Sequence, residues 1–182
     1  MSKRTTAKDR SLSLYQVFVR NYAPSGTFRE VEKDLDRIAA MGFDYLYLLP
    51  IHPIGVQQRK GDLGSPYAIS DYWAINPEYG TLEDFKQLIQ AVHDHHMKIM
   101  IDIVINHTAY DHPFTQSHPE YYYHKPNGGF GNRVGAWTDI LDLDYSCEAL
   151  REEMISMLCY WAKLGVDGYR CDVASLVPVS FW

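Results

Sequence analysis

The stretch Lys98-Ile99-Met100-Ile101-Asp102-Ile103-Val104-Ile105 is apolar except at its first and fifth residues. A run with so little polar alternation is typical of a strand that is buried on both faces, as in a parallel sheet covered by helices. Residues 14–20 and 43–49 are rich in aliphatic and aromatic side chains, and we expect them to form two more strands. We expect residues 166–172 to form a fourth strand.

Helical patterns separate these strands. Residues 27–42 begin with the T-x-x-E pattern of a capping box, formed by Thr27 and Glu30. They continue with apolar side chains at helical spacing, so we expect a helix here. Thr81 caps a second predicted helix, and residues 146–164 predict a third. Strand and helix therefore alternate three times before the fourth strand. This order predicts an α/β fold with a parallel sheet and right-handed crossovers.

Two irregular stretches, residues 51–80 and 106–145, are far longer than the usual connection between elements. Each follows the C-terminal end of a predicted strand, which is where α/β barrels and open α/β sheets build their functional sites. The topology therefore predicts where a site lies but not its chemistry.

Composition limits the class of protein. The chain has 182 residues, 46% of them hydrophobic, which is enough for one domain with a core. Its net charge of −6 and the lack of a basic run argue against a nucleic-acid partner. Residues 1–8 carry no signal-peptide pattern and no apolar run reaches membrane-spanning length, so we expect a cytoplasmic protein without membrane contact.

The stretch Gly168-Tyr169-Arg170-Cys171-Asp172 brings two charged groups together. Residues two apart in a strand share a face, so we expect the Arg170 guanidinium beside the Asp172 carboxylate. An oriented, ionised carboxylate suits covalent attack on a carbon or coordination of a cation. Such a pair is also common as a purely structural ion pair, so the motif alone leaves both interpretations open.

Four stretches of the chain, taken in order, match one enzyme family. Asp102-Ile103-Val104-Ile105-Asn106-His107 resembles the D-x-V-x-N-H signature of the α-amylase family of glycoside hydrolases (family 13). The stretch 168–172 resembles its G-[FY]-R-x-D signature. Residues 65–81 are similar to its tyrosine-containing loop, and residues 141–144 to a short stretch near the end of its inserted B domain.

The resemblance implies a TIM-type (β/α)8 barrel, of which this chain holds the first half, with about four strands and three helices. The implied domains are a first part of the barrel at residues 1–107, a short inserted B domain at residues 108–145, and the continuation through the fourth strand at residues 146–182. Four strands cannot close such a barrel. We therefore expect open sheet edges, an exposed apolar inner face and self-association through the open half-barrel.

The resemblance also implies roles for individual residues. It makes Asp172 the catalytic nucleophile and Arg170 the residue that positions it. It makes Tyr67 a platform for the sugar, His107 a hydrogen-bonding residue at the same sugar, and Asp102 a supporting residue of the substrate site.

A structural calcium ion is implied as well, bound by Asn106 and Asp142. A side-chain amide oxygen and a carboxylate are ligands that a hard cation prefers. Asn106 follows Asp102 by four residues, so we expect the two side chains on one face of a single strand.

The implied activity is hydrolysis, with retention, of α-glucosidic bonds in starch or maltooligosaccharides. A retaining glycosidase needs a second carboxyl group as general acid/base, about 5 Å from the nucleophile. The family takes this Glu from the fifth strand, so we expect it outside this chain and the chain alone to be inactive. Two alternatives stay open: a glucan-transferring enzyme, which residues 52–61 also resemble, and a non-catalytic fragment that at most binds sugar.

Overall fold

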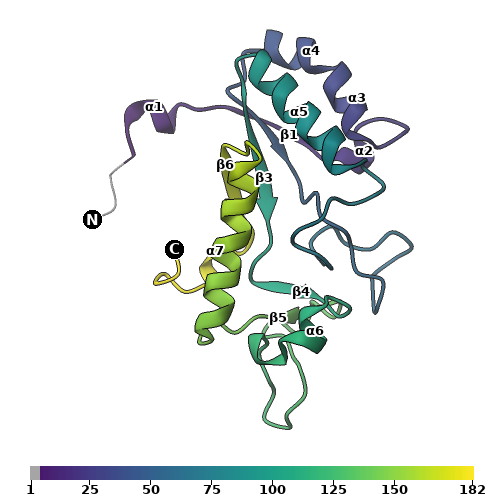
Figure 1. Cartoon of the computed structure of the whole chain (residues 1–182), viewed down its shortest axis with the longest axis vertical. Coiled ribbons are helices and arrows are strands. Elements are labelled where there is room, and N and C mark those ends of the chain that lie inside the picture. The colour runs from purple at the N-terminus through teal and green to yellow at the C-terminus, as the bar shows by residue number, and fades with distance from the viewer. Residues whose placement is uncertain (1–4) are drawn as a thin grey trace.

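The structure, a computed structural model, describes residues 5–182, so the first four residues of the polar N-terminus lie outside it (Figure 1). Its centre is a four-stranded parallel sheet in the order β1-β2-β3-β6. The strands are β1 (Leu14–Val17), β2 (Tyr45–Leu48), β3 (Lys98–Ile103) and β6 (Gly168–Cys171). The predicted α/β fold with four parallel strands is confirmed.

Helices cover one face of this sheet (Figure 1). The α-helices are α1 (Ala7–Arg10), α2 (Val19–Tyr22), α3 (Phe28–Lys33), α4 (Leu35–Ala40), α5 (Leu82–Asp94), α6 (Phe114–Ser117) and α7 (Glu148–Lys163), and the 3-10 turns are η1 (Pro119–Tyr121) and η2 (Ala174–Leu176). Helix α5 begins as predicted, because the Asp84 backbone N–H donates to Thr81 Oγ1 at 3.1 Å and the Thr81 N–H donates back to Asp84 Oδ2 at 2.8 Å. Over residues 5–182, no helix combines the length and the apolar character needed to cross a membrane.

The two faces of the sheet differ in chemistry. The face under the helices is apolar and buried, with Val17, Leu46, Leu48, Ile99, Ile101 and Ile103. The opposite face carries Gln16, Tyr45, Tyr47, Lys98 and Arg170 beside Leu14 and Met100. This second face is the inner face of the half-barrel, and the prediction that it is apolar is wrong, because tyrosine and charged side chains occupy much of it. Self-association through the open edges stays a prediction.

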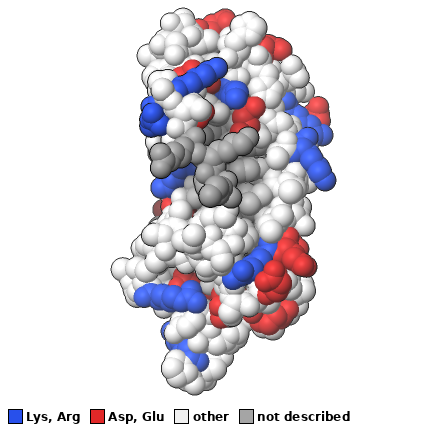
Figure 2. All heavy atoms as spheres, turned by 90° about the vertical axis from the view of Figure 1, so that its left-hand side faces the viewer, with Lys and Arg blue, Asp and Glu red and all other residues white. Residues whose placement is uncertain are grey.

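The molecular surface mixes charges of both signs on the side turned toward the viewer in Figure 2. Basic and acidic side chains lie near one another there, so this face presents no continuous basic field.

The first predicted helix is divided in two. Asp34 leaves helical geometry, with φ −103° and ψ 5°, and separates α3 from α4. Its carboxylate accepts hydrogen bonds from the Tyr22 hydroxyl and from Arg37 Nε, and these contacts compete with a continuous helix. The capping box at Thr27 is also wrong: Thr27 Oγ1 contacts Ser25 Oγ at 3.2 Å and caps no backbone N–H.

The two irregular stretches fold against each other. Within residues 106–145, β4 (His107–Ala109) pairs antiparallel with β5 (Ile140–Asp142). Within the stretch 51–80, an antiparallel bridge between Ile54 and Ile69 closes a hairpin, and the Ile69 carbonyl accepts from the Ala109 backbone N–H at 2.8 Å. Gly55 allows this approach, since a Cβ there would lie 2.2 Å from the Ala109 Cβ. The hairpin and the inserted segment therefore form one surface at the C-terminal ends of the strands.

Two histidines are buried in the core beneath this surface. His52 Nδ1 lies 3.2 Å from the Ala74 carbonyl oxygen, and the Phe114 backbone N–H donates to His112 Nδ1 at 3.1 Å. The Nε2 atom of each ring has no hydrogen-bond partner among the described residues. Burial lowers the pKa of both histidines to about 4.

We predict that these two histidines make the protein acid-sensitive. The unfolded chain protonates histidine near pH 6.5, so between pH 6.5 and 4 it binds more protons than the folded chain does. Stability is therefore fully present above pH 6.5 and falls as the pH drops toward 4, by about 2 kcal/mol per histidine at pH 4.5. Urea denaturation from pH 7 to pH 4.5 measures this loss.

His52→Asn and His112→Asn keep a polar atom near the Nδ1 position and remove the titration, so each should flatten the pH dependence. The matched control is His96→Asn, at an exposed position with φ 57°, a conformation that Asn tolerates. The control should keep the wild-type slope. Equal slopes in all four proteins would show that the buried histidines do not cause the acid sensitivity.

Candidate active site

A single guanidinium nitrogen joins two carboxylates at the C-terminal end of the sheet. Arg170 Nη1 donates to Asp102 Oδ1 and Oδ2, both at 3.0 Å, and to Asp172 Oδ1 at 2.8 Å. The register of β3 and β6 sets this arrangement, because Asp102 is directly opposite Arg170. The predicted Arg170–Asp172 pair is present, and the geometry adds Asp102 to it.

Asp102 is the anchor of this network, since its side chain is 0% exposed. Tyr47 Oη donates to its Oδ2 at 2.6 Å, and Tyr67 Oη donates to the same oxygen at 3.2 Å. Burial raises the pKa of the Asp102 carboxyl, while the hydrogen bonds from Tyr47 and Arg170 oppose this shift. Burial, with the charge of Asp102 next, raises the pKa of the Tyr67 hydroxyl to about 12, so it stays a donor at neutral pH.

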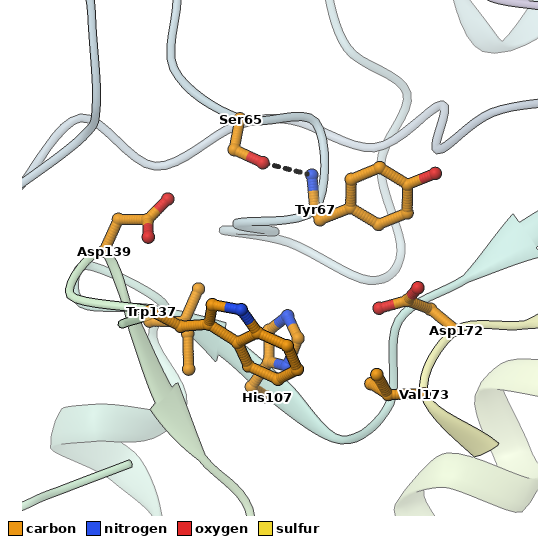
Figure 3. A pocket seen from close by; sticks show the side chains of 8 residues that line it. Ser65, Tyr67, His107, Trp137, Asp139, Asp172 and Val173 are labelled. Atoms are coloured by element: carbon orange, nitrogen blue, oxygen red, sulfur yellow. Dashed lines mark hydrogen bonds between the residues drawn. The ribbon is translucent and has the colours of Figure 1, made fainter. Parts of the chain in front are cut away.

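A cavity of about 200 Å³ opens beside this network (Figure 3). The residues that line it are Ser65, Tyr67, His107, Trp137, Asp139, Ile140, Asp172 and Val173. Three predicted site residues, Tyr67, His107 and Asp172, thus meet at one cavity. Asp102 is not among these lining residues, and its carboxylate accepts hydrogen bonds from Arg170 instead.

His107 lines the cavity, and its contact with Asn106 assigns its tautomer. Asn106 Nδ2 lies 3.1 Å from His107 Nδ1. An amide nitrogen only donates, so Nδ1 accepts this hydrogen bond and the ring proton is on Nε2. Burial lowers the pKa of His107, against the charges of Asp172 and Asp142, which raise it. In this tautomer, Nε2 carries the N–H donor of the ring.

Sequence patterns did not predict the wall of the cavity that Trp137 and Asp139 form. Trp137 packs against His107 with ring centroids 5.6 Å apart. Asp139 is buried, and its Oδ1 lies 2.9 Å from Lys60 Nζ, which also donates to the Ala136 carbonyl at 3.0 Å. A tryptophan just before the stretch 141–144, in an otherwise glycine-rich segment, was the available signal.

The turn after Asp172 is unusual. Val173 has φ 38° and ψ 43°, a left-handed conformation that is costly for a β-branched residue. Because β6 ends at Cys171, this turn directs the chain away from the sheet just as Asp172 reaches the cavity. An oriented carboxylate beside an aromatic ring and an N–H donor can attack the carbon of a ligand that stacks on Tyr67.

The structure brings together Asn106 and Asp142, the two residues implied for calcium. Asn106 does not, however, share a strand with Asp102 as predicted. Strand β3 ends at Ile103, so Asn106 lies beyond it, with its Nδ2 3.5 Å from Asp142 Oδ1. Calcium takes six to eight oxygen ligands. Here the amide turns its N–H toward Asp142, and the Arg133 guanidinium lies 3.6 Å from Asp142 Oδ2. This donor set, as arranged, does not fit a calcium ion.

Residues 5–182 offer no further metal site. No cluster of three or more His, Cys, Asp or Glu side chains in that range could hold a metal ion.

The family model "Alpha amylase, catalytic domain" matches residues 3–128 of this chain. Among solved structures, the chain is similar to an α-amylase from Lactobacillus plantarum, with 54% identity and a TM-score of 0.93 over 95% of this chain and 41% of that one. It is also similar to a maltogenic α-amylase from Thermotoga neapolitana, with 45% identity and a TM-score of 0.89 over 94% of this chain and 41% of that one.

Among curated proteins, the chain is 35% identical to an α-1,4-glucan:maltose-1-phosphate maltosyltransferase from Picrophilus torridus, over 93% of this chain and 30% of the relative. An enzyme of the same name from Pseudomonas aeruginosa is 36% identical over 95% of this chain and 30% of the relative. The chain therefore spans about 30% of the length of these curated relatives. These likenesses confirm the predicted fold, part of a (β/α)8 barrel.

We predict that Arg170 stabilises the fold by compensating the buried charge of Asp102. Arg170→Met leaves that carboxylate with hydroxyl donors only, and we expect the free energy of unfolding to fall by about 2 kcal/mol, less than for a fully buried pair because the Arg170 side chain is 42% exposed. Urea denaturation followed by circular dichroism measures the loss.

The double variant Arg170→Met/Asp102→Asn removes both charges and should recover most of this stability. If Arg170→Met is as stable as the wild type, or if the double variant is no better than the single one, Arg170 does not compensate Asp102.

Proposed function

The chain belongs to the family of α-amylase catalytic domains, and on that premise we propose that its cavity binds one glucose unit of an α-glucan, which Asp172 attacks at the anomeric carbon. One observation carries the proposal: Asp172 lines the cavity while Arg170 holds its Oδ1 at 2.8 Å. Oδ2 is then the oxygen available for attack. The hydrogen bond from Arg170 orients this carboxylate, as attack on a carbon requires.

The proposed reaction is a double displacement with retention. Asp172 Oδ2 forms a bond to the anomeric carbon as the glycosidic C–O bond breaks, and a general acid gives its proton to the leaving oxygen. The hydroxyl of water or of an acceptor sugar then attacks the anomeric carbon of the glycosyl-enzyme ester and gives its proton to the acid/base carboxylate. This step breaks the ester bond and releases Asp172.

The acid/base carboxyl is not assigned within the described cavity. Its other carboxylate, Asp139, is bound by Lys60 and lies at the opposite end from Asp172 (Figure 3). We therefore expect the acid/base Glu to come from sequence outside these 182 residues.

The sugar-binding roles follow from the same cavity. The Tyr67 ring offers a flat apolar surface for the sugar, and its hydroxyl is held by Asp102. His107 offers its Nε2–H to a sugar hydroxyl, since Asn106 occupies the other ring nitrogen.

Hydrolysis of starch-type or maltooligosaccharide substrates is the main proposal, with water as the second attacking group. Transfer to another sugar is the second candidate, and the curated relatives favour it because they are named as maltosyltransferases. Product analysis of the complete protein, with and without a maltooligosaccharide acceptor, separates the two. Chain-lengthened products indicate transfer, and an increase in reducing ends indicates hydrolysis.

We predict that Asp172→Asn in the complete protein lowers kcat by several orders of magnitude and leaves the melting temperature close to that of the wild type. The amide keeps the shape of the side chain and loses its nucleophilicity. Asp62→Asn, at an exposed position outside the cavity, is the matched control and should keep full activity. Near-normal turnover of Asp172→Asn would show that Asp172 is not the nucleophile. A wild-type protein that binds glucan without turnover would favour the sugar-binding alternative.

We also predict that Tyr67 binds the sugar through its ring. Tyr67→Ala removes the stacking surface and should weaken binding by about 1 kcal/mol, roughly a fivefold rise in KM. Tyr67→Phe keeps the ring and gives up only the 3.2 Å hydrogen bond to Asp102, so its KM should change much less. Equal losses in the two variants would assign the effect to the hydroxyl.

A further inference from the structure

The Arg133 side chain reaches a buried carboxylate that the proposed reaction does not use. Its backbone N–H donates to Asp142 Oδ2 at 2.6 Å, and its Nη1 lies 3.6 Å from the same oxygen. Nη1 also donates to the Leu143 carbonyl at 3.2 Å, and the guanidinium carbon lies 4.4 Å from the centre of the Tyr123 ring. Charge, hydrogen bonds and a cation–π contact thus hold the guanidinium at this place.

Asp142 needs a cation near it. Its side chain is 1% exposed, and an isolated carboxylate is costly to bury. The register of β4 and β5 places Asp142 directly opposite His107, at the base of the inserted segment. The other Asp142 oxygen, Oδ1, lies 3.5 Å from Asn106 Nδ2. Arg133 is the described basic residue that contacts this carboxylate.

The orientation of Asn106 agrees with a cation supplied by the protein. Its amide nitrogen lies between two acceptors, Asp142 Oδ1 and His107 Nδ1. A calcium ion at this place would require the amide oxygen to turn inward instead. Without a cation between them, turning the amide would put its oxygen against the Asp142 carboxylate.

We propose that the Arg133 guanidinium takes the place of a structural calcium ion at Asp142 and anchors the inserted segment to the barrel. Arg133 is then a positioning residue: it compensates Asp142, which holds Asn106, which holds the ring of His107 at the cavity. The proposal concerns the arrangement of these residues and does not depend on whether the enzyme hydrolyses or transfers.

Thermal unfolding with added CaCl2 or EDTA tests the proposal. The wild type should melt at the same temperature in both. Arg133→Met keeps much of the side-chain volume without the charge, and its melting temperature should fall by about 4 °C or more, because Asp142 loses its counter-charge. This variant should then regain stability with added CaCl2, since an uncompensated carboxylate and the Asn106 amide oxygen become available to a cation.

Three further variants control the interpretation. Arg59→Met makes the same chemical change at an exposed position and should melt like the wild type, with no response to CaCl2. Arg133→Lys retains the charge and should fall between Arg133→Met and the wild type. Arg133→Met/Asp142→Asn removes both charges and should recover stability without a response to calcium, which also keeps the test decisive if Arg133→Met alone does not fold.

Two results would overturn the proposal. One is a wild type whose melting temperature rises with CaCl2 and falls with EDTA, or that binds calcium in equilibrium dialysis, because calcium would then hold this site. The other is an Arg133→Met variant that melts like Arg59→Met, because the guanidinium would then carry no structural role.

Discussion

Arg170 donates from one nitrogen to a carboxylate that water does not reach and to a carboxylate that faces the cavity. Asp102 cannot remain ionised at 0% exposure without such a donor, and Asp172 gains its orientation from the same group. Arg170 can contact both carboxylates because the register of β3 and β6 places Asp102 directly opposite it. The polar inner face of the sheet follows from it, since Tyr47 completes the hydrogen bonding of Asp102.

The cavity depends on a second constraint, which is how the two long loops are tied to each other. Lys60 reaches from one loop to Asp139 in the other, and the Ala109 N–H joins β4 to the hairpin that carries Tyr67. These ties hold an aromatic ring on each side of one hollow, Tyr67 and Trp137 (Figure 3). Arg133 adds a cation beside Asp142, and Asp142 and His107 both lie within reach of the Asn106 amide.

Sequence patterns predicted elements well where burial dominates and poorly where polar contacts intervene. The apolar run of β3 and the capping of α5 depend on local chemistry, and both are present in the structure. Asp34 interrupts a good helical pattern because Tyr22, distant by 12 residues, and Arg37 bind its carboxylate. Asn106 leaves the predicted strand because β3 ends at Ile103 and the chain turns to start β4.

The sequence by itself determined the parallel α/β order and the family resemblance, because strand periodicity and signature spacing are properties of the chain. That Tyr67, His107 and Asp172 belong to one site was implied by the resemblance. Only the tertiary structure decided that Asp102 is buried and positions Arg170, and that Trp137 and Asp139 line the cavity. It also decided that Arg133 faces Asp142. Such contacts join residues far apart in the chain or in irregular segments, where no periodicity reports which way a side chain points.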